Sequence, residues 1–158
     1  MTHEQATTIP TGTVLDRLPE EERARLAAIG SLLAFDPGDE ILRAGTPTPF
    51  LAVVQRGRVA LRLRVPERGR VTIVTIEPGE LLGWSAVVTP YRVTADAVAT
   101  EPVRLLAFDA PSLRARLAAD PELAANLLPL VLESVSERLS ASWDQLLDVF
   151  GPQPWEPW

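Results

Sequence analysis

Short apolar runs, each closed by a turn rich in Gly or Pro, follow one another from residue 31 to residue 109. Runs of this length suit β-strands, and Gly and Pro supply the backbone angles that tight turns require. The first three runs end at turns over residues 36–39, 44–47 and 56–57. Such a succession of short strands and turns favours a β-roll or jelly roll over an open sheet.

The clearest pair of strands lies in the middle of this region. Apolar residues alternate with mostly charged ones over residues 58–65, the Pro-Glu-Arg-Gly segment 66–69 has the composition of a turn, and the run 71–76 returns. This pattern predicts a hairpin with one solvated face. Its arginines have two interpretations: they form a solvated strand face, or they dock an acidic partner. The arginines are Arg58, Arg62, Arg64, Arg68 and Arg70.

Helical patterns flank the strand region on both sides. Pro19 and the acids after it start a short N-terminal helix, and Asp109 and Asp120 are suited to cap two C-terminal helices. In the last helix apolar residues recur every three or four positions up to Phe150. At 1.5 Å per residue this helix is roughly 40 Å long, which is more than one β-roll can cover. We therefore expect a homodimer that forms through it.

These elements predict a mainly β fold with flanking helices. It is a jelly roll or β-roll of about eight strands, two of them at residues 95–99 and 103–108, with a short N-terminal helix and a long C-terminal dimerisation helix. We expect residues 1–12 to form a flexible arm, residues 13–150 one domain, and residues 151–158 a Pro-interrupted tail. The two Trp residues of the tail are able to fold back onto the domain.

The composition argues against an enzyme and against a nucleic-acid-binding protein. A net charge of -6 and a pI of about 4.8 do not fit the basic face that nucleic acid requires. The chain has no Cys, and its single His is His3 in the arm, so a thiol nucleophile, a positioned catalytic base and a metal site are all missing. It has neither a signal peptide nor a membrane-length apolar run, so we expect a cytoplasmic protein with no membrane partner.

One stretch, residues 78–94, interrupts the strands with a short helix-capable segment and then presents a lone Arg. Gly83 allows the backbone to approach a ligand closely, and the small residues after it can offer N–H groups from a first helical turn. Arg92 can bind two phosphate oxygens with its forked guanidinium. The stretch therefore predicts a site for a small anion.

The order of these elements resembles the cyclic-nucleotide-binding domain of Crp/Fnr-type sensors over residues 15–150. That family has a phosphate-binding cassette of the form Phe-Gly-Glu-Leu-Ala-Leu, a few residues, then Pro-Arg-Ala-Ala-Thr. Here the cassette, residues 82–94, reads Leu-Gly-Trp-Ser-Ala-Val, then Val-Thr-Pro-Tyr-Arg-Val-Thr. The resemblance implies a regulatory sensor whose ligand is cAMP, cGMP or another small anion. DNA-binding members of the family add a helix-turn-helix domain after the long helix, whereas this chain stops at Trp158, so we expect a stand-alone sensor without a DNA-binding domain.

The resemblance also assigns the ligand site. Gly83 and Ala86 occupy matching positions, Arg92 matches the Arg that holds the cyclic phosphate, and Thr94 lies close to the family's small hydroxyl residue. Trp84 stands where the family has a Glu that hydrogen-bonds the ribose, and an indole offers a donor but no acceptor. The expected ligand-binding residues are Gly83, Trp84, Ser85, Ala86, Arg92, Val93 and Thr94.

Several side chains have a second interpretation. Arg92 clamps an anion or pairs with a carboxylate such as Asp96. Trp84 is a stacking surface or plug of the nucleotide pocket, or it fills the core. Ser85 bonds a phosphate oxygen or caps the short helix. Trp143 closes over a ligand as a lid or lies in an interface.

Two functions remain open on the sequence alone. In the first, the chain is a non-enzymatic regulatory sensor in which ligand binding at the cassette changes the packing of the long helix. In the second, it is a ligand-free dimeric scaffold that holds a partner protein through its C-terminal helix and Trp-rich tail.

Overall fold

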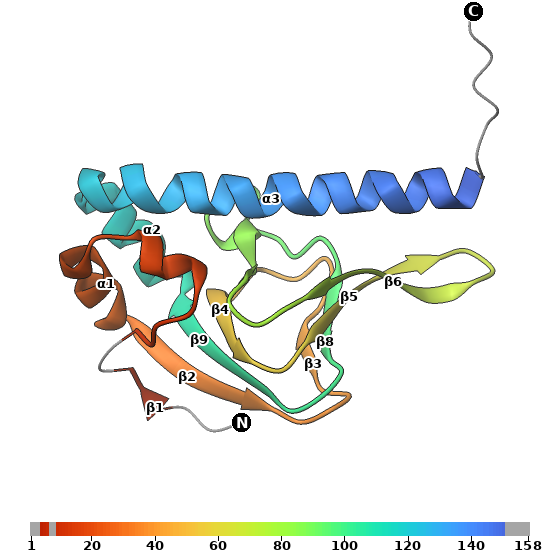
Figure 1. The fold of residues 1–158 in the computed structure, drawn as a ribbon, viewed down its shortest axis with the longest axis horizontal. Helices are drawn as coiled ribbons and strands as arrows, with labels where there is room; N and C mark the ends of the chain where they lie inside the picture. Colours follow the sequence, from red (N-terminus) through yellow and green to blue (C-terminus); the bar gives the residue numbers. More distant parts are fainter. Residues whose placement is uncertain (1–3, 7–8, 151–158) are drawn as a thin grey trace, which may run out of the picture.

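Two antiparallel sheets form the body of the molecule (Figure 1), in a computed structural model that describes residues 4–6 and 9–150. The described strands are β1 (Glu4–Gln5), β2 (Gly30–Phe35), β3 (Glu40–Leu42), β4 (Phe50–Arg56), β5 (Val59–Val65), β6 (Gly69–Ile76), β7 (Leu81–Leu82), β8 (Asp96–Ala99) and β9 (Val103–Asp109). The helices are η1 (Val14–Arg17), α1 (Glu20–Ala27), η2 (Trp84–Ala86), α2 (Ala110–Ala119) and α3 (Pro121–Phe150). The strand orders are β1-β2-β9-β4-β7 in one sheet and β3-β8-β5-β6 in the other. The predicted β-roll with flanking helices is confirmed.

Three short elements, β1, β7 and η1, were not predicted from the sequence patterns. β1 pairs with β2, with Glu4 opposite Leu32, so the arm that was expected to be flexible contains a strand. β7 and η1 are only two and four residues long, and hydrophobic periodicity needs longer windows. With β1 and β7 the described residues form nine strands, where about eight were predicted. The Pro- and Trp-containing tail at residues 151–158, with its predicted contacts, lies outside the described residues.

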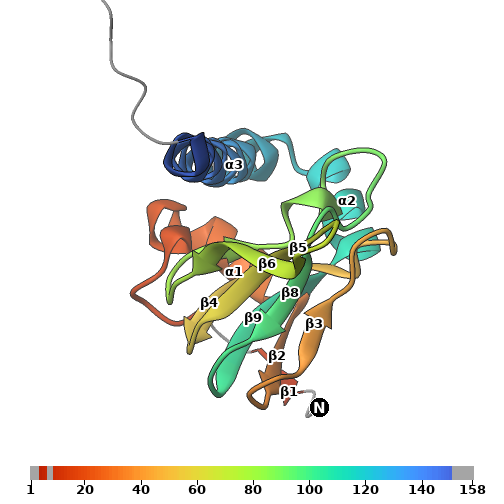
Figure 2. The same ribbon diagram turned by 90° about the vertical axis from the view of Figure 1, so that its right-hand side faces the viewer.

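The strands divide their side chains between two hydrophobic clusters, because successive residues of a strand point to opposite faces. On β4, Ala52 and Val54 belong to the cluster between the two sheets. Leu51 and Val53 belong to a second cluster, which joins the same sheet to the helices. Figure 2 shows these layers from the end of α3, with the helices above the sheets. One strand thus anchors both the roll and the helical layer.

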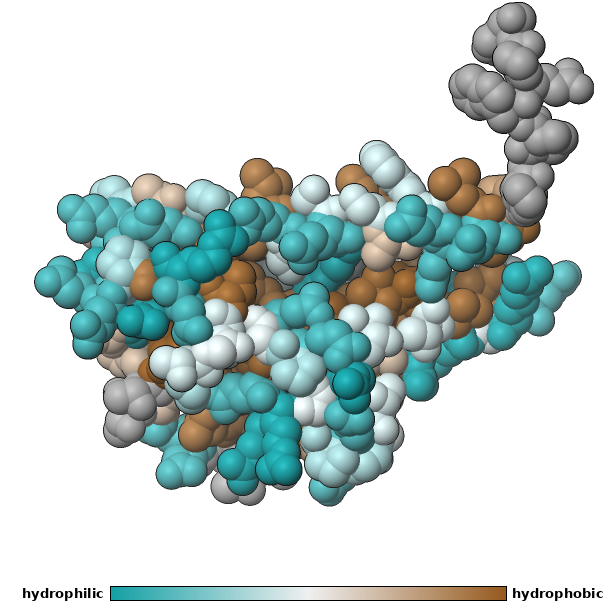
Figure 3. All heavy atoms as spheres, viewed as in Figure 1, coloured by the Kyte–Doolittle hydropathy of each residue, from teal (hydrophilic) through white to brown (hydrophobic). Residues whose placement is uncertain are grey.

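The long helix α3 lies across the helical side of the molecule and extends past the roll (Figure 1). At its start the Oδ1 atom of Asp120 accepts a hydrogen bond from the N–H of Leu123 at 3.2 Å, as expected of a cap. Leu123 and Leu127 are fully buried. Other apolar side chains of α3 are exposed, and brown spheres mark several of them in Figure 3. They are Leu128, Leu132, Leu139, Trp143, Leu146, Leu147, Val149 and Phe150.

The hairpin β5–β6 projects from the roll beneath the C-terminal half of α3 (Figure 1). Its register places Val59 opposite Ile76 at the base and Arg64 opposite Arg70 near the tip. Val59 and Ile76 are fully buried, whereas both arginines are exposed. The predicted hairpin with one solvated face is confirmed. None of the described helices is long and apolar enough to cross a membrane.

Candidate functional site

The cassette begins with a glycine that packs directly against strand β4. Gly83 has a φ of +83°, in the left-handed region, and precedes η2. A Cβ atom at this position would lie 2.4 Å from the carbonyl oxygen of Phe50, which is a clash with backbone. The left-handed angle and the close approach both require Gly here. The start of the cassette is therefore fixed against the roll.

The two residues that end η2 are buried. The hydroxyl groups of Ser85 and Thr48 lie 2.6 Å apart, and both residues are almost fully buried. Ala86 is fully buried, and its carbonyl oxygen accepts a hydrogen bond from Nη1 of Arg114 at 2.8 Å. The partner of Ser85 is thus Thr48, which neither sequence-based interpretation included. These contacts hold η2 to the loop before β4 and to α2.

The loop between η2 and Arg92 is held by α2. The guanidinium carbon of Arg114 lies 4.2 Å from the centre of the Tyr91 ring, in a cation–π contact. Tyr91 has a φ of +61°, which is uncommon for a residue other than Gly. Since Arg114 also bonds Ala86, one side chain of α2 ties together both ends of this loop. α2 leads directly into α3, so the loop is connected to the long helix.

The predicted phosphate clamp, Arg92, lies at the surface. Its Nη1 atom donates a hydrogen bond to the carbonyl oxygen of Gly45 at 2.7 Å, and its backbone forms a bridge with Pro47. Among the described ion pairs none joins Arg92 to Asp96. Asp96 instead lies 3.6 Å from Nε of Arg70 and accepts the N–H of Ala44 at 2.8 Å. The guanidinium of Arg92 is therefore held beside the β3–β4 loop by a neutral acceptor.

Five of the other six predicted ligand residues border one small cavity, which we call the cassette pocket. It has a volume of about 30 Å³ and lies between the cassette, the strands of the roll and α3. Five predicted residues line it: Gly83, Trp84, Ser85, Val93 and Thr94. Arg92 and Ala86 are not among the lining residues. Trp84 is half-buried and also packs against the helix-side cluster, so it serves the core and the pocket at once.

One lining residue, Arg138 of α3, is absent from the sequence-based site. Its Nη2 atom is buried and has no hydrogen-bond partner among the described residues. Burial lowers the pKa of Arg138 to about 10, against the opposing charges of Glu80 and Glu137. A buried guanidinium retains a strong demand for an acceptor, because its charge has lost part of its hydration. The pocket thus contains an unused cationic donor.

A sequence signal for Arg138 was present but weak. The buried residues Leu123, Leu127 and Val131 recur every four positions along α3, and Arg138 follows seven positions later on the same face. An Arg at a position that continues a buried stripe is unusual, because Arg is almost never fully buried unless it is paired. The signal was hidden because the other apolar stripe of α3, which is exposed, dominates the sequence pattern.

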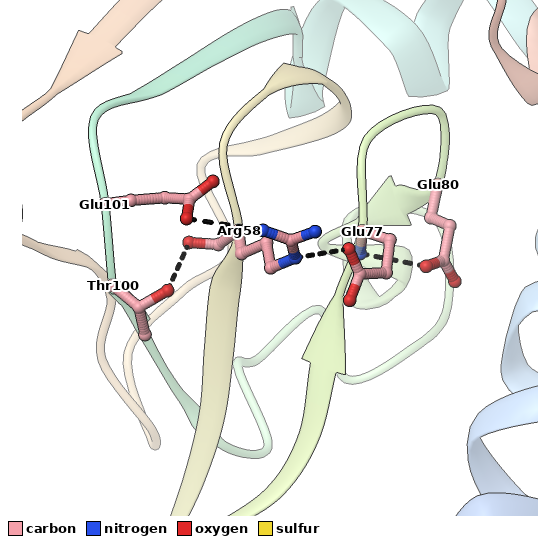
Figure 4. Close-up of polar contacts among 5 residues, drawn as sticks. All are labelled: Arg58, Glu77, Glu80, Thr100 and Glu101. Carbon is pink, nitrogen blue, oxygen red and sulfur yellow. Dashed lines mark hydrogen bonds and ion pairs between the residues drawn. The ribbon is translucent and has the colours of Figure 1, made fainter.

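The turn that leads into the cassette is part of a surface network (Figure 4). Nε of Arg58 donates to Glu77 at 2.7 Å, and its Nη1 reaches Glu101 at 3.4 Å. The Thr100 hydroxyl donates to the carbonyl oxygen of Arg58 at 3.1 Å. The N–H of Glu77 in turn donates to Glu80 at 2.8 Å. These exposed contacts join three turns of the roll. They fix the positions of the turns relative to one another but add little to the free energy of folding, because exposed ion pairs are weak.

A family model described as Cyclic nucleotide-binding domain matches residues 32–120 of the chain. The matched segment includes the whole cassette. The comparison with curated proteins found no match.

Several solved structures share the fold. A candidate cyclic nucleotide-binding protein from Geobacter metallireducens is 27% identical, with a TM-score of 0.71 over 78% of this chain and 89% of that one. The N-terminal domain of a transcriptional regulator from Streptomyces coelicolor is 29% identical, with a TM-score of 0.64 over 87% and 93%. A cyclic nucleotide-binding domain from Methylobacillus flagellatus is 22% identical, with a TM-score of 0.76 over 93% and 80%, and shows the likeness of fold alone.

Proposed function

Because this chain belongs to the cyclic nucleotide-binding domain family, we propose that it is a non-enzymatic regulatory module that binds a small anion in the cassette pocket. The ligands to consider first are cAMP and cGMP. The observation that carries this proposal is that the cassette and Arg138 meet at one cavity, where a buried guanidinium nitrogen of Arg138 has no hydrogen-bond partner among the described residues. A charged donor in such a position favours a ligand with an anionic acceptor.

Ligand entry requires the pocket to enlarge. Its present volume of about 30 Å³ is roughly that of a water molecule, whereas small-molecule sites usually measure about 300 Å³ or more. α3 contributes Arg138 to the pocket and also packs beside η2 and β6. A shift of α3 is therefore the movement that opens the site. We assign the small pocket to the resting state and an altered packing of α3 to the bound state.

The proposed roles of the cassette residues combine the family resemblance with their positions. Arg92 is the phosphate ligand that the family resemblance implies, and it would exchange the carbonyl oxygen of Gly45 for an anionic oxygen. Thr94, Ser85 and Gly83 border the cavity with short side chains or none. Trp84 supplies a flat apolar surface where a ribose-binding acid is expected. Ribose recognition by a carboxylate is therefore not part of the proposed binding mode.

The exposed apolar residues of α3 support a homodimer. Eight large apolar side chains lie open on this helix, and a second copy of α3 would cover them. The dimer would place two cassette pockets beside one helical interface. A change of α3 packing in one subunit would then reach its partner.

A ligand-free scaffold is the second candidate function, favoured by the small volume of the pocket and by the bond between Arg92 and Gly45. Thermal unfolding with and without cAMP or cGMP separates the two. A ligand present at about 100 times its Kd stabilises the folded state by about 2.7 kcal/mol. The sensor predicts a raised midpoint with at least one nucleotide and a smaller rise for Arg92→Ala. Unchanged midpoints with both nucleotides favour the scaffold.

A further inference from the structure

The outer face of the hairpin β5–β6 carries a hollow lined mainly by arginines, which we call the basic groove. Its volume is about 370 Å³. Arg62 and Arg64 lie on β5, Arg70 on β6, Arg43 after β3, and Asp96 on β8. The groove therefore belongs to the sheet β3-β8-β5-β6 and is separate from the cassette pocket.

The charges of the groove are not balanced within the described part of the chain. Nε of Arg43 lies 2.6 Å from Oε1 of Glu40, and Arg70 lies 3.6 Å from Asp96. No described ion pair involves Arg62 or Arg64. Four guanidinium groups thus face two carboxylates, although the chain as a whole has a net charge of -6. The positive excess is a local property of this face.

The register makes the arrangement costly without a partner. Arg64 lies directly opposite Arg70 in the antiparallel pair β5–β6. Like charges in this position repel and destabilise the pair. A strand face that only needs to be solvated would be served as well by mixed charges. Arg56 and Arg104 are opposed in the same way on the other sheet, so the register alone does not mark a site. The hollow beside Arg56 and Arg104 also contains Asp36 and Glu101, whereas the basic groove is lined by four arginines and one carboxylate, and this unbalanced charge points to a bound anion.

We propose that the basic groove binds an extended acidic segment of a partner protein. Arg62 and Arg64 lie two residues apart on one strand, so their Cα atoms are about 6.6 Å apart. Alternate residues of an extended peptide have the same spacing and point to the same side. Carboxylates at alternate positions therefore match the row of guanidinium groups. A long nucleic acid fits less well. It would extend beyond the groove and meet the rest of the protein surface, where the net charge is negative.

A labelled peptide of alternating Glu and Ser tests the proposal, with a Gln-Ser peptide of equal length as the reference. Fluorescence anisotropy measures binding to the full chain at about 0.1 M and about 1 M salt, between which the screening length falls from about 10 Å to about 3 Å. We expect binding of the Glu peptide only, with a strong loss at the higher salt. Equal binding of the two peptides, or none by the Glu peptide, overturns the proposal.

A pair of double variants locates the site. Arg62→Gln with Arg64→Gln should weaken peptide binding by about tenfold, since each exposed charge contact contributes up to about fivefold. Arg56→Gln with Arg104→Gln is the matched control, because these exposed arginines also lie opposite each other and the net charge changes equally. We expect less than about a twofold effect in the control. Equal losses in both double variants would show that only net charge matters and would reject the groove.

Two further measurements test the identity of the occupant and the argument from register. A single-stranded oligonucleotide or phosphatidylserine vesicles that bind more tightly than the Glu peptide would refute a protein segment as the occupant. The thermal midpoint of the variant with Arg62→Gln and Arg64→Gln should equal or exceed that of the unaltered chain, because the repulsion between Arg64 and Arg70 is removed. A lower midpoint contradicts the argument from register. If that variant does not fold, Arg64→Gln alone provides both measurements.

Discussion

The guanidinium of Arg92 donates a hydrogen bond from Nη1 to the carbonyl oxygen of Gly45 at 2.7 Å. The residue that the family resemblance assigns to an anion is thus held by a neutral backbone acceptor at the edge of the β3–β4 loop. An anionic oxygen adds Coulomb attraction to the hydrogen bond, and an anion with two oxygens can accept two parallel N–H bonds from one guanidinium. An anion can therefore displace the carbonyl. In the proposed binding mode, this exchange would couple ligand binding to the loop that precedes β4.

The tight packing of Gly83 gives a first prediction. Gly83→Ala places a Cβ atom 2.4 Å from the carbonyl oxygen of Phe50 and forces a left-handed angle on Ala. The angle alone costs about 1–2 kcal/mol, and the clash must move the backbone of β4. We expect a loss of roughly 3 kcal/mol in urea unfolding.

Gly45→Ala is the matched control for this substitution. Gly45 has a similar φ of +84°, but a Cβ atom there meets nothing within 4 Å. Its variant should lose only the cost of the backbone angle. Equal losses for the two variants would contradict the close approach of the cassette to β4.

The buried hydroxyl pair gives a second prediction. Ser85→Ala leaves the hydroxyl of Thr48 buried without its partner at 2.6 Å, which should cost about 1–2 kcal/mol in unfolding free energy. Thr48→Val should cost a similar amount. The double variant should cost less than the sum, because neither hydroxyl is then left unpaired. Additive losses in the double-mutant cycle would show that the two groups do not interact.

Arg138 should oppose folding and favour ligand. The pKa of Arg138 in the folded chain is lowered by burial to about 10, well below the ordinary value of an arginine. The protonated form is therefore penalised on folding in full at every pH below about 10. The penalty begins to fall as the pH rises through the folded pKa and is lost only above the higher pKa of the unfolded chain. Arg138→Met lacks this penalty, so it should unfold at a higher temperature than the unaltered chain near pH 8. The difference should narrow near pH 11; a constant difference would reject the buried charge as its cause.

The fold was largely predictable because most of its strands are marked by local sequence patterns. The turn composition and alternation at residues 58–76 fixed the hairpin, and Asp109 capped α2 as expected by accepting the N–H of Ser112 at 3.0 Å. β7 has two residues and owes its existence to pairing with β4, which no local pattern encodes. The longer strands could thus be predicted from the sequence, whereas the shortest could not.

The site was only half predictable for a different reason. Residues 83–85 and 93–94 are close in sequence, and the structure brings them to one cavity. Arg138, on α3, follows Thr94 by more than forty residues in the sequence, so only the packing of α3 reveals it. The bond of Arg92 to Gly45 depends on where the β3–β4 loop lies, which side-chain type alone does not determine.

The proposed dimer predicts the effect of polar residues on α3. Trp143 and Leu147 are 58% and 68% exposed, so their replacement by Gln should not reduce the stability of the folded subunit. It should convert a dimer to a monomer in sedimentation equilibrium, because the apolar surface that joins two copies is lost. Val88→Gln, at an exposed apolar residue outside α3, is the control and should remain dimeric. An unaltered chain that sediments as a monomer would contradict the dimer.

Isothermal titration of the full chain with cAMP and cGMP tests the central claim most directly. We predict saturable heat with at least one of the two nucleotides. Binding should be at least about tenfold weaker in Arg92→Ala and in Arg138→Gln, as expected when a charge-assisted hydrogen bond is lost. It should be unchanged in Arg116→Gln, a control on α2 that does not line the pocket. No heat with either nucleotide, or equal affinity in all these variants, would contradict an anion-binding cassette pocket.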